Sequence, residues 1–187
     1  HSLRLPCPSS SRRCSCSIVL PNRIMVSPMC QYSSDNGMPN DWHLVHLGSR
    51  AIGGAAMVCV EASGVTPEGR ITPWDAGIWS EAHGQAWKRV AAFIRAQGSV
   101  PGIQLAHAGR KASTDLPWLG GAPLSPAARG WQPVAPSPLP FASGFPVPRE
   151  LTADDLASVE GQFRDATRRA DAAGFHESER EGRAGKE

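Results

Sequence analysis

Residues 56–60 read AMVCV, a near-continuous apolar run. A strand of a parallel sheet has this composition, because such sheets in α/β proteins are covered on both faces. The sequence predicts a helix on each side of this run. The first spans Asp41 to about Gly53, and the second is capped by Ser80 and closed by Gly98.

Two further strands and a third helix extend the alternation. Residues 24–29 (IMVSPM) form an apolar run stopped by a proline, and residues 103–106 (IQLA) predict another strand. After a long loop, Thr152 and Asp155 predict the cap of a helix that ends at Gly174. Its expected buried face carries Leu156, Val159, Phe163, Ala166 and Ala170.

Alternating strands and helices predict an α/β fold with a parallel sheet and right-handed crossovers. Periodicity leaves open whether the sheet is doubly wound or closes into a barrel. No G-x-G-x-x-G follows the first strand, which disfavours a dinucleotide-binding Rossmann fold.

Composition excludes several classes of protein. The 187 residues are 41% hydrophobic, enough for one folded domain, and lack the run of about 18 apolar residues that a spanning helix needs. A net charge of +2 is too small to indicate nucleic-acid binding. The five cysteines all lie at or before Cys59, which favours a reducing compartment over a disulfide framework. His43 and His46 have no third ligand at metal-binding spacing, so no metal site is predicted.

The two ends differ from the body of the chain, which spans residues 20–175. Residues 1–19 predict an irregular or disordered leader, rich in Ser and Arg over residues 1–17; a targeting segment or an out-of-frame stretch are alternatives. Residues 176–187 carry seven charged side chains in twelve and predict a disordered tail. A fourth strand is therefore not expected after the third helix. Residues 117–148 hold nine of the 17 prolines and predict a long loop over the strand ends, as a lid or wall.

Polar residues gather where strands end, the usual place for chemistry in parallel α/β folds. Gln104 lies inside an apolar strand, and its buried amide needs partners that a bound ligand would supply. Glu61 is expected either to pair with Arg110 or Arg50 or to act in catalysis.

For each of three other residues at the strand ends, the sequence allows two roles. Cys30 is a small buried apolar residue or a functional thiol. His107 is a hydrogen-bonded scaffold residue or a general base, and the absence of a partner carboxylate favours the scaffold. Tyr32, the only tyrosine, donates to a substrate or caps its loop.

Several segments resemble the old yellow enzyme family, and more narrowly its bacterial-type NADPH dehydrogenases with a cysteine beside the flavin. They occur in the family's order over about residues 20–175. The segments are 22–24 (NRI), 27–32 (SPMCQY), 60–65 (VEASGV), 67–71 (PEGRI), 77–79 (GIW) and 102–111 (GIQLAHAGRK).

The resemblance implies a TIM (β/α)8 barrel of which about the first three βα units are present. It implies FMN at the carboxyl ends of the strands, NADPH or NADH as hydride donor, and an activated alkene of the enone type as substrate. The implied site residues are Ser27, Pro28, Met29 and Cys30 beside the flavin, Ala62 through its backbone, Gln104 at the pyrimidine edge and Tyr32 at the substrate.

The family's substrate-binding histidine pair, its proton-donor tyrosine and its phosphate site have no counterpart here, so no catalytic residue is assigned. Little or no activity is expected from the chain as written. The alternatives are a non-catalytic half-barrel and the N-terminal part of another FMN barrel enzyme, such as a dienoyl-CoA reductase. Neither nucleic acid nor a membrane is an expected partner, and a homo-oligomer stays open. A cytoplasmic location is favoured, with organelle targeting by the leader as the alternative.

Overall fold

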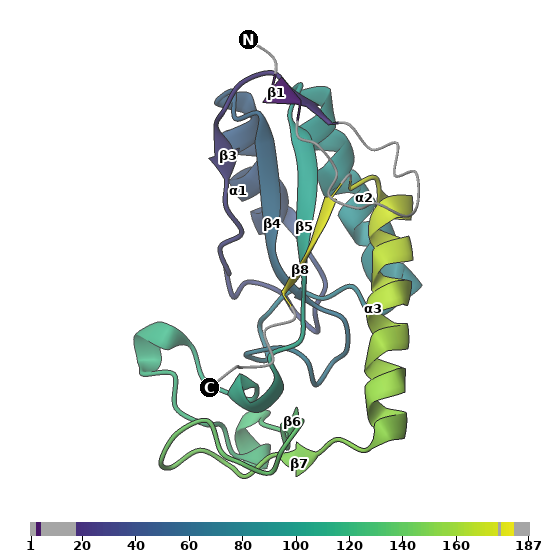
Figure 1. Ribbon diagram of the computed structural model, residues 1–187. Helices are drawn as coiled ribbons and strands as arrows, with labels where there is room; N and C mark the ends of the chain where they lie inside the picture. The colour runs from purple at the N-terminus through teal and green to yellow at the C-terminus, as the bar shows by residue number, and fades with distance from the viewer. Residues whose placement is uncertain (1–2, 5–17, 176, 182–187) are drawn as a thin grey trace.

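The computed structural model describes residues 3–4, 18–175 and 177–181, and a parallel sheet forms its centre. Four strands lie in the order β3-β4-β5-β8 (Figure 1). Their bounds are Met25–Val26 for β3, Met57–Gly64 for β4, Val100–Ala106 for β5 and Glu177–Glu181 for β8. The crossovers carry helices α1 (Asp41–Ile52), α2 (Glu81–Ala96) and α3 (Ala153–Ala173). The predicted parallel α/β order is confirmed for these elements.

The hydrophobic core lies between the sheet and the three helices. Strand β5 contributes Ile103 and Leu105, both fully buried, and α2 contributes Trp87 and Ile94. Because side chains alternate along a strand, Gln104 faces the opposite side of the sheet. The sheet therefore has one face that packs against helices and another that carries a polar side chain.

The helix ends follow from capping residues. Asn40, not Asp41, is the N-cap of α1, because its side chain accepts a hydrogen bond from the Trp42 amide at 3.0 Å. Ser80 caps α2 and Thr152 caps α3, as the sequence predicts. Helix α3 ends at Gly174, whose φ of 96° lies in the left-handed region that suits glycine.

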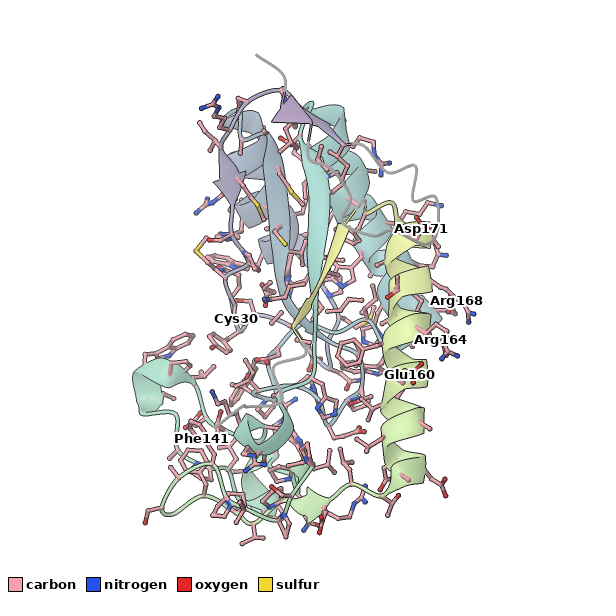
Figure 2. All side chains as sticks on the ribbon, viewed as in Figure 1. Cys30, Phe141, Glu160, Arg164, Arg168 and Asp171 are labelled. Carbon is pink, nitrogen blue, oxygen red and sulfur yellow. The ribbon has the colours of Figure 1, made fainter. Side chains whose placement is uncertain are left out.

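Helix α3 is less buried than its sequence pattern predicts. Ala166 and Ala170 are buried and Phe163 packs against the core, whereas Leu156 is 50% exposed. The amino-terminal turns of α3 extend past the end of the sheet (Figure 1), so Leu156 has no strand to pack against. Figure 2 shows the charged side chains of α3, Glu160 and Arg164 among them, along the outer side of the helix.

The long segment between β5 and α3 lies beyond the carboxyl ends of the strands (Figure 1). It has short 3-10 turns at Gly109–Lys111, Pro117–Leu119 and Pro126–Ala128, and a strand β6 (Val134–Ala135) paired with β7 (Arg149–Glu150). Arg110 holds two parts of this segment together by donating hydrogen bonds to the Leu139 carbonyl and the Ser137 hydroxyl. The predicted position over the strand ends is thus observed, although part of the segment is regular.

The two ends of the chain differ from the sequence prediction where the structure describes them. Leu3–Arg4 (β1) pairs antiparallel with Val19–Leu20 (β2), whereas the leader 1–19 is predicted to be irregular. Strand β8 falls in the segment 176–187 that is predicted to be disordered. The physical reason is that strand pairing uses backbone groups, which a charged sequence also has, and that buried Phe175 anchors the chain beside β5. Residues 1–2, 5–17, 176 and 182–187 lie outside the described part.

Among the described residues, no helix is both long enough and apolar enough to cross a membrane.

Candidate functional site

The predicted site residues of three strands lie together at the carboxyl ends of the strands. Residues 27–32 follow β3 directly, Ala62 lies in β4 and Gln104 in β5. Ala62 and Gln104 are register partners in the parallel pair β4–β5, so their side chains lie next to each other. Cys30 lies at the same end of the sheet, which is also the end where the long segment with Phe141 lies (Figure 2).

The side chains after β3 are only partly covered. Ser27 and Met29 are exposed, the latter by 48%, and Pro28 and Cys30 are half-buried. A ligand placed against this segment thus meets accessible backbone and side-chain atoms. The sulfur atom of Cys30 is close enough to interact with the Tyr32 hydroxyl.

The Gln104 amide is the group in the sheet that most clearly fits a cofactor. It is half-buried between two fully buried neighbours, Ile103 and Leu105. Within residues 18–175 no hydrogen bond joins its side-chain amide to another group. An amide there presents two donors and an acceptor, which matches the alternating groups of a flavin pyrimidine edge. Its register partner Ala62 carries only a methyl group, so these two residues fit a flat ring such as that of FMN.

Tyr32 lies in a strained turn over the strand ends. Its φ is 51°, in the left-handed region that non-glycine residues seldom adopt. Its ring meets the Trp118 ring edge-on, with 5.6 Å between the centroids. Burial raises the pKa of Tyr32 to about 12, with added contributions from Cys30, Asp75 and Glu61. The phenol therefore stays protonated near neutral pH and can donate a hydrogen bond.

The single tyrosine makes this pKa directly measurable. We expect absorbance at 295 nm, followed against pH, to show no tyrosinate inflection near 10 while the chain is folded, because the Tyr32 pKa is about 12. The same titration in concentrated urea is the control and should inflect near 10. An inflection near 10 in the folded chain would contradict the burial of the hydroxyl.

Glu61 has a different partner from those the sequence suggests. It pairs with neither Arg110 nor Arg50; its Oε2 lies 3.8 Å from Nε2 of His43, and both side chains are almost fully buried. The Ser34 hydroxyl lies 3.3 Å from the same His43 nitrogen. Sequence reasoning considered His43 only as a metal ligand, and a buried pair between α1 and β4 leaves no local pattern.

Burial shifts the pKa of each member of this pair in the direction that favours its neutral form. The pKa of His43 falls to about 4, because desolvation and nearby His46 disfavour the imidazolium. The pKa of Glu61 rises to about 8, because desolvation outweighs the hydrogen bond from the Gln31 backbone amide. Near pH 7 the pair is therefore an uncharged imidazole beside an uncharged carboxylic acid.

A β-bulge brings Glu61 to this place. Val60 pairs with Ile103 and Ala62 pairs with Gln104, which leaves Glu61 as the extra residue of β4. Ser63 closes the bulge by donating from its hydroxyl to the Glu61 carbonyl at 3.0 Å. The bulge thereby turns Ala62 to the face that carries Gln104. The predicted strand stops at Val60, so the sequence pattern missed it.

His107 is held as a neutral ring. The Gly109 amide donates to its Nδ1 at 3.1 Å, so the hydrogen of the neutral ring lies on Nε2. Burial lowers the pKa of His107, against a smaller opposing contribution from Glu68. Its Nε2 is buried and has no partner among the described residues. This geometry gives a positioned hydrogen-bond donor and shows no partner carboxylate on the ring.

The sequence matches the NADH:flavin oxidoreductase / NADH oxidase family over residues 16–179. It is 41% identical over 162 residues to an NADH:flavin oxidoreductase of Gibberella zeae, covering 84% of this chain and 39% of that protein. It is 42% identical over 157 residues to an NADPH dehydrogenase of Clostridium acetobutylicum, covering 83% of this chain and 42% of that protein. The chain thus spans about 40% of the length of these curated relatives.

Solved structures agree with the sequence comparison. Morphinone reductase superposes with a TM-score of 0.71 at 29% identity, covering 87% of this chain and 44% of that protein. An old yellow enzyme homologue from Zymomonas mobilis superposes with a TM-score of 0.72 at 25% identity, covering 87% of this chain and 45% of that one. The predicted partial TIM barrel is thereby confirmed. By its sequence match and its fold, the chain belongs to the NADH:flavin oxidoreductase / NADH oxidase family.

Proposed function

We propose that the chain forms the flavin-contacting part of an FMN-dependent NAD(P)H oxidoreductase of the ene-reductase type. The observation that carries the proposal is the Gln104 amide, half-buried in β5 and without a hydrogen bond from residues 18–175. The chemistry that FMN supplies when bound is hydride transfer from NAD(P)H to the β-carbon of an activated alkene.

The residues at the strand ends take separate roles in this proposal. Gln104 donates to and accepts from the pyrimidine edge of the flavin, which satisfies an amide otherwise costly to bury. Ala62 offers its backbone, since its methyl group leaves room for a flat ring. The segment Ser27, Pro28, Met29 and Cys30 lines the ring, with the Cys30 thiol close to it.

Tyr32 orients the substrate. Its phenol is protonated near neutral pH, because burial raises its pKa to about 12. It donates a hydrogen bond to the carbonyl oxygen of an enone-type substrate, and so polarises the conjugated double bond. The Trp118 ring against Tyr32 limits the space beside the substrate oxygen.

The test is a titration of the purified chain with FMN, followed by flavin fluorescence quenching and by the visible spectrum after desalting. Gln104→Leu removes the amide at similar volume, and Gln85→Leu, on the exposed face of α2, is the matched control. We expect Gln104→Leu to raise the dissociation constant of FMN about tenfold or more, because two hydrogen bonds are lost. Gln85→Leu should leave it unchanged.

Two results would refute the proposal. One is an unmodified chain that neither quenches FMN fluorescence nor shifts the flavin absorption bands. The other is equal FMN affinity in the Gln104→Leu and Gln85→Leu variants, which would place the flavin away from β5. A circular dichroism spectrum of each variant shows that the chain is folded before affinities are compared.

A further inference from the structure

The long segment between β5 and α3 brings two exposed apolar side chains to the proposed site. Trp118 is 66% exposed and Leu119 is 63% exposed, and both lie in the 3-10 turn Pro117–Leu119. The Trp118 ring meets the Tyr32 ring edge-on, with 5.6 Å between the centroids and 78° between the ring planes. An indole that is mostly exposed contributes little to the core, so its contact with a site residue is the feature to explain.

Backbone hydrogen bonds close this part of the segment into a hairpin, residues 114–123. Its cross-strand hydrogen bonds run from the Asp115 amide to the Ala122 carbonyl at 2.8 Å and from the Gly121 amide to the Leu116 carbonyl at 3.1 Å. Gly120 ends the 3-10 turn with a φ of 100°, in the left-handed region that glycine adopts readily. The hairpin therefore holds the backbone of Trp118 in one place.

The hairpin and the segment after β3 are bonded to the same loop, the one that follows β4. At the base of the hairpin, the buried Thr114 donates from its amide to the Ile71 carbonyl at 2.9 Å. Two residues after Tyr32, the Ser34 amide donates to the Trp74 carbonyl at 3.0 Å. The two rings therefore come from two segments that one loop holds.

A buried carboxyl group fixes this loop internally. Asp75 is 2% exposed; its Oδ2 accepts from the Ile71 amide and its Oδ1 from the Thr72 hydroxyl, each at 2.6 Å. Ile71 and Trp74, which bind the two segments, are thus parts of one closed turn. The two backbones are held together without the ring contact, so what the contact adds is the place of the Tyr32 side chain.

The Tyr32 side chain has need of such a contact. Its φ of 51° is a conformation that persists in a non-glycine residue only where the surroundings determine it. The residue is half-buried, so part of its side chain borders solvent. Edge-on aromatic pairs at this separation attract each other, because the positive edge of one ring meets the negative face of the other. A rotation of the Tyr32 side chain away from Trp118 would lose that attraction.

We propose that Trp118 is a positioning residue for Tyr32: the hairpin holds its indole against the phenol ring, and this contact keeps the Tyr32 side chain in place at the strand ends. That the phenol then donates to a substrate oxygen rests on the proposed function. The positioning itself is a property of the chain without FMN.

The test uses the only tyrosine of the chain as its own probe. In chains with isotope-labelled tyrosine, the three-bond couplings between Hα and Hβ report the rotamer populations of Tyr32 alone. We expect the population of minor rotamers to rise about threefold or more in Trp118→Ala. Trp118→Phe keeps an aromatic ring and should restore most of the original population. Leu119→Ala, at an equally exposed position of the same turn, is the matched control and should leave the couplings unchanged.

Titration of the phenol by absorbance at 295 nm is the second readout. Burial is the largest cause of the raised pKa of Tyr32, which is about 12 in the folded chain. We expect this pKa to fall towards 10 in Trp118→Ala, because a side chain released from the indole is more exposed to water. It should stay near 12 in Leu119→Ala. Far-UV circular dichroism checks that each variant is folded, and Trp118→Leu replaces Trp118→Ala if that variant is not.

Three results would overturn the proposal. The first is a Trp118→Ala variant with the rotamer populations of the unmodified chain. The second is an equal change in Trp118→Ala and Leu119→Ala, which would show a general effect of the turn. The third is a Trp118→Phe variant as altered as Trp118→Ala, which would exclude a contact between rings. Neither readout needs FMN, so a chain that fails to bind FMN would refute the proposed function and leave this test intact.

Discussion

Replacing Trp87 by alanine is expected to lower the free energy of unfolding by about 4 kcal/mol, enough to unfold a marginally stable chain. The side chain is fully buried, and its indole donates to the Gly77 carbonyl at 2.9 Å. Its ring meets the rings of His43 and Phe175 edge-on, with centroids 5.5 Å and 6.2 Å away. The substitution leaves a large cavity where α1, α2 and the segment entering β8 meet, and an unpaired carbonyl.

Urea unfolding followed by far-UV circular dichroism measures this effect. Trp118→Ala is the matched control, since Trp118 is 66% exposed and its loss should change the free energy of unfolding by no more than about 0.5 kcal/mol. Trp87→Phe, which keeps a ring but loses the donor, should fall between the two. Equal unfolding midpoints for Trp87→Ala and Trp118→Ala would contradict this account of the core.

Replacing Glu61 by glutamine is expected to stabilise the chain, and more at pH 8 than at pH 5. The folded chain raises the pKa of Glu61 from 4.5 to about 8. The unfolded chain therefore releases this proton between pH 4.5 and 8 while the folded chain holds it, so stability falls as pH rises through that window. Glutamine has no proton to lose, so between pH 5 and pH 8 the variant should gain roughly 3 to 4 kcal/mol of stability relative to the unmodified chain.

His43 has the opposite dependence, which separates the two groups. Its folded pKa of about 4 lies below the usual value of 6.5, so its contribution is complete above pH 6.5 and is lost as pH falls towards 4. Urea unfolding at pH 5, 6.5 and 8 distinguishes them. Glu150→Gln, at an exposed position, is the control and should not alter the pH profile. A Glu61→Gln variant whose stability follows that of the unmodified chain at every pH would exclude a neutral Glu61.

The elements that the sequence predicts well are those that local chemistry decides. Ser80, Thr152 and Gly174 cap helices in the structure as they do in the sequence pattern, because a cap involves only neighbouring residues. The apolar runs of β4 and β5 mark the strands, although their ends differ. That β4 and β5 are neighbours also follows from the βα order, since consecutive parallel strands align their carboxyl ends, whereas the pairing of Ala62 with Gln104 depends on the bulge.

What the sequence does not show depends on pairing across long distances. The partner of Glu61 is His43, and the bulge that places Glu61 leaves no local pattern. The contact between Tyr32 and Trp118 joins two loops whose paths are set by the whole fold. The charged composition of β8 reports on side chains, whereas its pairing with β5 depends on backbone groups that every sequence carries.

The sheet order β3-β4-β5-β8 is also the order in which the strands are synthesised. During translation each new strand therefore emerges beside a neighbour that is already complete, and no strand has to insert between two others. The core can grow outward from β3 and β4 one crossover at a time. The number of residues between paired strands increases from Met25↔Met57 to Gly102↔Glu177. Of these pairings, the one with β8 therefore has the largest entropy cost of loop closure, and it forms when most of the apolar surface is already buried.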